Sequence, residues 1–184
     1  MIEYATREDL LSFANKISIN EQVSLRKRAE DRSPTGATFL SHSSQDMELV
    51  VGAVRLLENH GAYVYIDKKD PALPPYTNKE TAVGLKNRIH QSQKFVLLAS
   101  ENSKASTWVP WELAIADESK GLRRVAILPA VEQQSNTTWS TREYLGLYDR
   151  IVWGDLENHE KKVWMVLDQM KNTATELSAW LKRS

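Results

Sequence analysis

Short apolar runs alternate with longer helical patterns along most of the chain, and this alternation restricts the fold more than any other feature. Five runs between residues 37 and 153 are bounded by polar or helix-breaking residues, as strands are. These runs are Ala37–Ser41, Ala62–Asp67, Lys94–Ser100, Arg124–Pro129 and Arg150–Trp153. Strands that are separated by helices form parallel sheets with right-handed crossovers and helices on both faces. We therefore expect an α/β fold of three layers.

The first 36 residues have a different pattern and predict an N-terminal helical extension. Thr6 and Asp9 have the spacing of a capping box, which predicts a helix that begins near Thr6. A second, highly charged helix is predicted from about residue 20 to Asp31, and Ser33–Gly36 ends it. Its charges are typical of a solvated face. We divide the chain into residues 1–36, the extension, and residues 37–184, the α/β domain.

The C-terminal segment repeats apolar residues at helical intervals. From about Leu156 to Lys182 the repeat predicts one long amphipathic helix that packs on the sheet or on a partner. The residues of its apolar stripe are Val163, Val166, Leu167, Met170, Ala174, Leu177 and Leu181.

Composition excludes several functional classes. The 24 basic and 24 acidic residues give a formal charge of zero, so no overall field attracts nucleic acid. The chain has no cysteine, which excludes disulfides and thiolate zinc sites and fits a reducing, cytoplasmic setting. Its four histidines are scattered, so no metal site is predicted. No apolar run has membrane-spanning length, and we expect neither export nor insertion.

Polar loops follow the first three predicted strands, at the sheet edge where parallel sheets bind ligands. They are Ser41–Asp46, Asp67–Pro71 and Ser100–Ser103. Ser43 and Asp46 also have capping-box spacing, so simple capping remains an equal alternative there. Neither a dinucleotide-binding Gly-x-Gly-x-x-Gly motif nor a phosphate loop of the NTPase type occurs. The Ser41-His42 pair lacks the Gly-x-Ser-x-Gly elbow of a serine hydrolase.

The segment Ser106–Leu113 is the most unusual part of the chain. Pro110 is tolerated only in the first turn of a helix, so a helix is predicted to begin near Ser106 and to run toward Gly121. Trp108 and Glu112 are four residues apart and share one face of it, whereas Trp111 points about 100° away and is expected in the core. A helix-start glutamate is usually a solvated partner of the helix dipole.

Taken in order, these motifs resemble the Toll/interleukin-1 receptor (TIR) domain family, in particular its bacterial, NAD-cleaving members. The matching segments, spread over about residues 37–153, are Phe39–Ser43, Asp67, Lys94–Ser100, Ser106-x-Trp108-x-x-x-Glu112-Leu113 and Glu143–Tyr148. Val109 stands where the family has cysteine, and the loop from Lys68 to Asn78 lacks the glycine that usually follows its proline.

The resemblance implies a flavodoxin-like sheet with strand order 2-1-3-4-5 and cleavage of NAD+ between nicotinamide and ribose. The products would be nicotinamide and ADP-ribose, or a cyclic isomer of it, as a signal or as NAD+ depletion in antiphage defence. Glu112 matches the catalytic glutamate. By the same resemblance Ser41, His42, Asp46, Asp67, Lys68 and Trp108 are expected to contact NAD+, which is a substrate, and no cofactor is expected.

The chemistry fits a single acid. Glycosidases use two carboxylates because an oxygen leaving group must be protonated. Nicotinamide leaves as a neutral amine from a cationic precursor, so one carboxylate that stabilises the sugar cation is enough. The alternatives are a non-catalytic TIR adaptor that self-associates and a nucleoside deoxyribosyltransferase-like enzyme. Family members commonly form homo-oligomers, and a signalling product would need an effector protein to respond to it.

Overall fold

The strands form one eight-stranded sheet that is mostly parallel. A computed structural model describes residues 2–67, 79–106, 108–134 and 143–183. Its strands are β1 (Ala5–Thr6), β2 (Thr38–Ser41), β3 (Val64–Tyr65), β4 (Lys94–Ala99), β5 (Val125–Val131), β6 (Asp149–Gly154), β7 (Val163–Asp168) and β8 (Thr173–Glu176). The sheet order is β3-β2-β4-β5-β6-β7-β8, with β1 paired to β5.

The five strands expected from the sequence are β2 to β6, and they pair in parallel. Numbered by their order in the sequence, they lie as 2-1-3-4-5, so the flavodoxin-like arrangement is confirmed. Thr38 pairs with Lys94 at the start of β2 and β4, and Ser41 pairs with Leu97 farther along. The parallel register therefore places the ends of neighbouring strands, and the loops that follow them, at one edge of the sheet.

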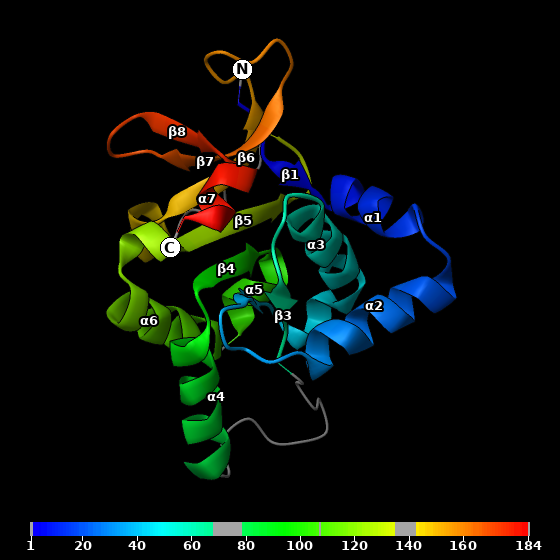
Figure 1. The fold of residues 1–184 in the computed structure, drawn as a ribbon, viewed down its shortest axis with the longest axis vertical. Coiled ribbons are helices and arrows are strands. Elements are labelled where there is room, and N and C mark those ends of the chain that lie inside the picture. Colours follow the sequence, from blue (N-terminus) through cyan, green and yellow to red (C-terminus); the bar gives the residue numbers. More distant parts are fainter. Residues whose placement is uncertain (1, 68–78, 107, 135–142, 184) are drawn as a thin grey trace.

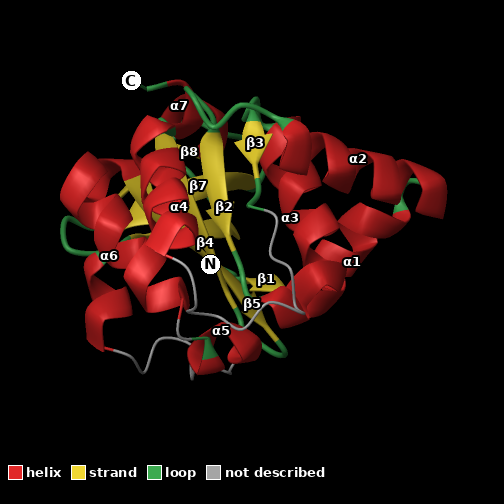
Figure 2. Cartoon of the chain, turned by 90° about the horizontal axis from the view of Figure 1, so that it is seen from below, coloured by secondary structure: helices red, strands yellow, loops and turns green. Residues whose placement is uncertain are grey.

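Helices cover both faces of the sheet (Figures 1 and 2). One face carries α1 (Arg7–Asn15), α2 (Ile19–Asp31) and α3 (Met47–Asn59), and the other carries α4 (Lys79–Gln91) and α6 (Trp108–Lys120). Two short helices, α5 (Glu101–Ala105) and α7 (Leu177–Lys182), lie at opposite ends of the molecule in Figure 2. The three-layer prediction is confirmed.

Alternating side chains of the central strands divide the core into two clusters. In β4, Val96 and Leu98 pack with the layer of α1 to α3, whereas Phe95 and Leu97 pack with α4 and α6. Successive strand residues point to opposite faces, so a strand buried on both sides needs an unbroken apolar run. The run Phe95–Ala99 meets that requirement, and all six residues of β4, including Lys94 at its start, are buried.

The N-terminal segment is part of this packing. The Thr6–Asp9 capping box predicted from the sequence forms at the start of α1. Leu10 and Ala14 of α1 and Leu25 and Ala29 of α2 are buried in the first core cluster. The division of the chain after residue 36 remains a prediction.

The prediction of one long C-terminal helix is wrong. Residues 163–176 form the antiparallel hairpin β7–β8, and only Leu177–Lys182 are helical. Met170, placed on the apolar stripe by the prediction, lies between the two strands and is 78% exposed. Asn172 has a φ of 50°, a left-handed conformation that asparagine tolerates in a tight connection. The apolar run that follows Val163 forms a strand because its side chains are buried on both faces of the sheet.

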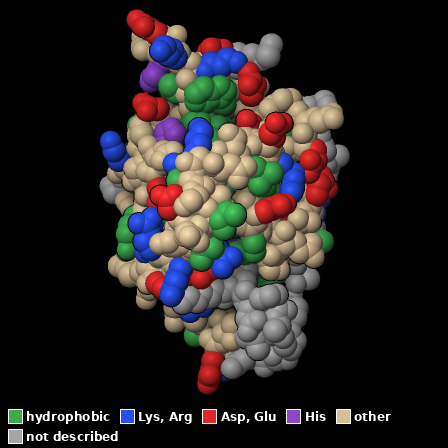
Figure 3. All heavy atoms as spheres, turned by 90° about the vertical axis from the view of Figure 1, so that its right-hand side faces the viewer, with side chains coloured by type: hydrophobic (Ala, Val, Ile, Leu, Met, Phe, Trp, Pro, Cys, Tyr) green, Lys and Arg blue, Asp and Glu red, His purple; other side chains and the backbone are tan. Residues whose placement is uncertain are grey.

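The outer face of α1 and α2 mixes both signs of charge with scattered hydrophobic side chains (Figure 3). Lys27 and Arg28 of α2 are exposed, and Arg26 pairs with Glu30 one turn away. The solvated face predicted for this helix is therefore confirmed. None of the helices in the described ranges is both long and apolar enough to cross a membrane.

We predict that Gly52→Ala prevents α1 from docking on α3. A β-carbon at Gly52 would lie 1.9 Å from the backbone oxygen of Leu10. Alanine favours an isolated helix by about 1 kcal/mol over glycine, but this clash requires the backbone to move, and we expect a net loss of at least about 2 kcal/mol. Urea unfolding measures this loss in the free energy of unfolding. Gly146→Ala is the control because nothing lies within 4 Å of its added carbon, and equal stability of the two variants would contradict the tight α1–α3 contact.

We also predict that ionisation of Asp149 lowers the free energy of unfolding, so that this loss of stability depends on pH. Burial, and then the charge of Asp168 opposite it, raise the pKa of Asp149 from 3.8 to about 6. The native state therefore holds this proton more tightly than the unfolded chain does. No penalty exists below about pH 3.8, and the full penalty is present above about pH 6.

Asp149→Asn should consequently be more stable than the wild type at pH 7.5, by about 1–2 kcal/mol after allowance for solvent screening. The difference should disappear as the pH falls toward 4. Urea unfolding across this range tests it, with Glu118→Gln on the exposed side of α6 as the control. A pH-independent difference would show that the ionisation of Asp149 is not its source.

Candidate active site

Ser41 reaches α6 because of the alternation in β2. Phe39 packs in the cluster beneath α4 and α6, whereas Leu40 packs beneath α3. Ser41 is two residues after Phe39, so its side chain points to the same face. It is fully buried, and its hydroxyl donates a hydrogen bond to Oε2 of Glu112.

Glu112 lies on the buried stripe of α6. The apolar members of that stripe, Val109, Leu113 and Ala116, pack toward the sheet, and Glu112 falls between them at helical spacing. Pro110 occupies the first turn, as predicted, and the Ser106 hydroxyl caps the helix by accepting a hydrogen bond from the Val109 amide. Glu112 has no exposed surface, so the usual solvated position of a helix-start glutamate does not apply here.

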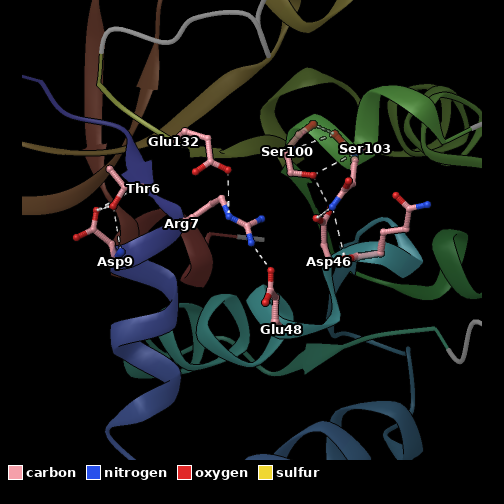
Figure 4. Close-up of polar contacts among 10 residues, drawn as sticks. Thr6, Arg7, Asp9, Asp46, Glu48, Ser100, Ser103 and Glu132 are labelled. Atoms are coloured by element: carbon pink, nitrogen blue, oxygen red, sulfur yellow. Dashed lines mark hydrogen bonds and ion pairs between the residues drawn. The ribbon is translucent and has the colours of Figure 1, made fainter.

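Asp46 connects the loops that follow β2 and β4 (Figure 4). Its carboxylate is fully buried and accepts hydrogen bonds from the hydroxyl of Ser100 and, at 2.7 Å, from the amide nitrogen of Asn102. The capping box considered for Ser43 and Asp46 does not form. The Ser43 hydroxyl instead accepts from the Gln45 amide in a short 3₁₀ turn, Ser44–Asp46.

Arg7 of α1 lies at the same edge of the sheet and joins two carboxylates there. Its guanidinium pairs with Glu48 in the first turn of α3 and, at 3.1 Å from Nε, with Glu132 just after β5 (Figure 4). These acids are both more than half exposed, so the pairs orient α1 more than they stabilise the fold.

His42 follows Ser41 and is 1% exposed. Its Nδ1 lies 3.4 Å from the backbone oxygen of Leu40. The imidazole is therefore buried at the position where the chain leaves β2.

Asp67 is held by neighbours on the α4 side of the sheet. Its Oδ1 accepts from the Tyr65 hydroxyl at 2.9 Å and lies 2.7 Å from Nε of Arg88 in α4. Burial, with Asp67 as the next cause, raises the pKa of the Tyr65 phenol, which therefore stays a donor. Lys68, the other residue predicted in this loop, lies outside the described residues.

The two tryptophans of α6 differ from the prediction. Trp111, expected in the core, is 37% exposed, and this expectation is wrong. Trp108 is partly buried and packs against the second core cluster. The rings meet edge to face with centroids 5.3 Å apart, a favourable arrangement of aromatic quadrupoles.

The structure thus brings Ser41 and Glu112 together in one buried place, buries His42 directly after Ser41, and connects Asp46 to the next loop. Ser100, Asn102 and Arg88 were not predicted as site residues, although the polar loop after the third predicted strand was the available signal for the first two. In the part of the chain that the structure describes, no three His, Asp or Glu side chains are grouped to hold a metal ion.

We predict that Asp46→Asn loosens the contact between the two loops. The amide has only one acceptor oxygen, so at least one hydrogen bond to a charged group is lost, which corresponds to about 1.5–3 kcal/mol of unfolding free energy. Chemical denaturation measures this loss. Glu101→Gln, which breaks an exposed pair with Lys104, is the control and should change stability by less than about 1 kcal/mol. Wild-type stability of Asp46→Asn would show that the contact contributes nothing.

Comparison with known proteins identifies the family. The model of the TIR domain family matches residues 38–167. A relative from Bacillus cereus (strain MSX-D12), named probable 3' cyclic ADP-D-ribose synthase ThsB', is 34% identical over 138 residues, which cover 73% of this chain and 70% of that protein. The family match includes β2 and α6, which together place Ser41 against Glu112. The chain belongs to the TIR domain family.

Proposed function

We propose that this TIR protein cleaves NAD+ between nicotinamide and ribose and releases nicotinamide with ADP-ribose or a cyclic ADP-ribose. The name of the Bacillus cereus relative supports a cyclic ADP-ribose product. The observation that carries the proposal is the burial of Glu112 beside Ser41, at the end of a parallel strand. Ligands bind at this end of open α/β sheets.

Glu112 would stabilise the positive charge that develops on the ribose as nicotinamide departs. The leaving group is neutral once the bond breaks, so no second acid is needed to protonate it. A carboxylate held away from water acts more strongly on a cationic transition state than an exposed one does. Glu112 is also the fifth residue of α6, close to the end of the helix at which the dipole is positive.

The hydroxyl of Ser41 indicates how a sugar would bind. It donates to Oε2 of Glu112, and a ribose hydroxyl is a donor of the same chemistry. Because Glu112 is fully buried, substrate must displace some of the atoms around it. We infer that a ribose hydroxyl replaces the Ser41 hydroxyl as the donor to Glu112, and that Ser41 then positions the sugar.

The other predicted contacts have different parts in the proposal. Trp108 would wall the nicotinamide side, with its ring available to a cationic pyridinium. His42 would line the strand end, and Asp67 with Lys68 would contribute from the next loop. Asp46 is already bonded to Ser100 and Asn102, so its part is to hold the loop around the substrate.

A cyclic product would act as a signal in antiphage defence, read by an effector protein. Self-association through TIR–TIR contacts would regulate the activity, and the absence of cysteine fits the cytoplasm. The alternative is a non-catalytic adaptor that acts through self-association and releases no nicotinamide. Nicotinamide release from NAD+ by the purified protein separates the two.

We predict that Glu112→Gln lowers NAD+ turnover by about 100-fold or more, the usual loss when a group that stabilises transition-state charge is removed. Glutamine keeps the shape and an oxygen that can accept from Ser41, so the thermal unfolding temperature should change little. Chromatography of nicotinamide and ADP-ribose isomers measures turnover and product together.

Glu118→Gln is the matched control, because it removes an acid from the exposed side of the same helix. It should retain wild-type turnover. Normal turnover in the folded Glu112→Gln variant would reject the catalytic role, and no nicotinamide release from a folded, self-associating wild type would favour the adaptor.

A further inference from the structure

A cavity lies at the opposite end of the sheet from Glu112. It has a volume of about 850 Å³ and is lined by the first residues of β4 and β6, the end of α6 and residues of α7. Lys94, on its wall, pairs with Thr38 at the start of β2, whereas Ser41 ends that strand. The cavity is therefore distinct from the candidate active site, and its size suits a small organic ligand.

The lining of this cavity is strongly basic. Its cationic members are Lys94, Lys120, Arg123, Arg124, Lys171 and Arg183. Two acids, Asp149 and Asp168, also line it, and Asp168 pairs with Lys171 at 2.8 Å. Within the described ranges, no acidic side chain forms an ion pair with any of the five other cations. The neutral chain thus carries a local excess of positive charge in a hollow, which concentrates anions.

Two of these cations are built into the fold. Lys94 is 2% exposed, and its ammonium lies 4.7 Å from the centre of the Trp180 ring. Lys120 donates to the backbone oxygens of Ile89 and Ser92. Burial, and then the charge of Arg124, lower the pKa of each lysine to about 8. An anion in the cavity would offset the repulsion between Arg124 and these two lysines.

The acids mark a different side of the same cavity. Asp149 and Asp168 come from neighbouring ends of the paired strands β6 and β7, whereas Lys94 and Lys120 come from β4 and the end of α6, and Arg183 follows α7. Carboxylates that line a cavity accept hydrogen bonds from hydroxyl groups. The cavity therefore offers cations to one part of a ligand and acceptors to another.

We propose that this cavity binds a phosphate ester of a hydroxylated compound, a sugar phosphate or a nucleotide. The phosphate contacts Lys94, Arg124 and Arg183, and the sugar hydroxyls face Asp149. Arginine forks and a lysine charge are the groups that recognise phosphate in proteins. This binding does not depend on NAD+ cleavage.

Isothermal titration calorimetry of the full chain tests the proposal with ribose 5-phosphate and ADP as probes, and with ribose and inorganic phosphate as their fragments. We expect saturable binding of at least one phosphate ester, tighter than that of either fragment. Tighter binding of ribose 5-phosphate would indicate a sugar phosphate as the ligand, and tighter binding of ADP would indicate a nucleotide. Absence of saturable binding by both esters would overturn the proposal.

Variants locate the binding. Arg124→Gln and Arg183→Gln, both at exposed residues, should each weaken it by about tenfold or more, as expected for a lost hydrogen bond to a charged group. The control Lys161→Gln removes an exposed cation from the connection between β6 and β7, which lies at the opposite end of these strands from the cavity. It should not weaken binding. Ser41→Ala tests the candidate active site and should leave affinity unchanged. Equal weakening by Lys161→Gln, or loss only in Ser41→Ala, would contradict the proposed place.

Discussion

The whole arrangement depends on a sheet that is buried on both faces. Each central strand must supply apolar side chains to two layers at once, and the alternation of the backbone decides which residue enters which layer. In β2 this rule sends Leu40 toward α3 and Ser41 toward α6. A shift of one residue would turn Ser41 away from Glu112. The geometry of the candidate site is therefore a result of core packing.

Much of this fold was predictable from sequence because its strands are continuous apolar runs with clear borders. The parallel pairing and the helices on both faces followed from those runs, whereas the order of the strands followed from the family resemblance. The C-terminal hairpin did not, since the residues from Val163 to Leu181 happen to repeat at helical intervals while β7 itself is a short apolar run. Periodicity alone does not separate a strand buried on both faces from a helix of similar composition.

The site was predictable to a smaller extent. Glu112 was identified through its motif. Its burial follows from the apolar stripe that it shares with Val109 and Leu113. The sequence prediction considered only the face that Glu112 shares with Trp108. Trp111 is partly exposed because that stripe is narrow and points elsewhere. The partners of Asp46 and Asp67 could not be read from spacing, since Ser100 and Arg88 come from other loops and helices.

The N-terminal pairing of β1 with β5 has a consequence for where this protein can be divided. The family match begins at residue 38, yet Ala5 pairs with Ala130, and Leu10 is completely enclosed. A fragment starting at the match would leave part of β5 without its neighbouring strand and open α3 to water. The limits of evolutionary likeness and the limits of the cooperative folding unit are consequently different in this chain.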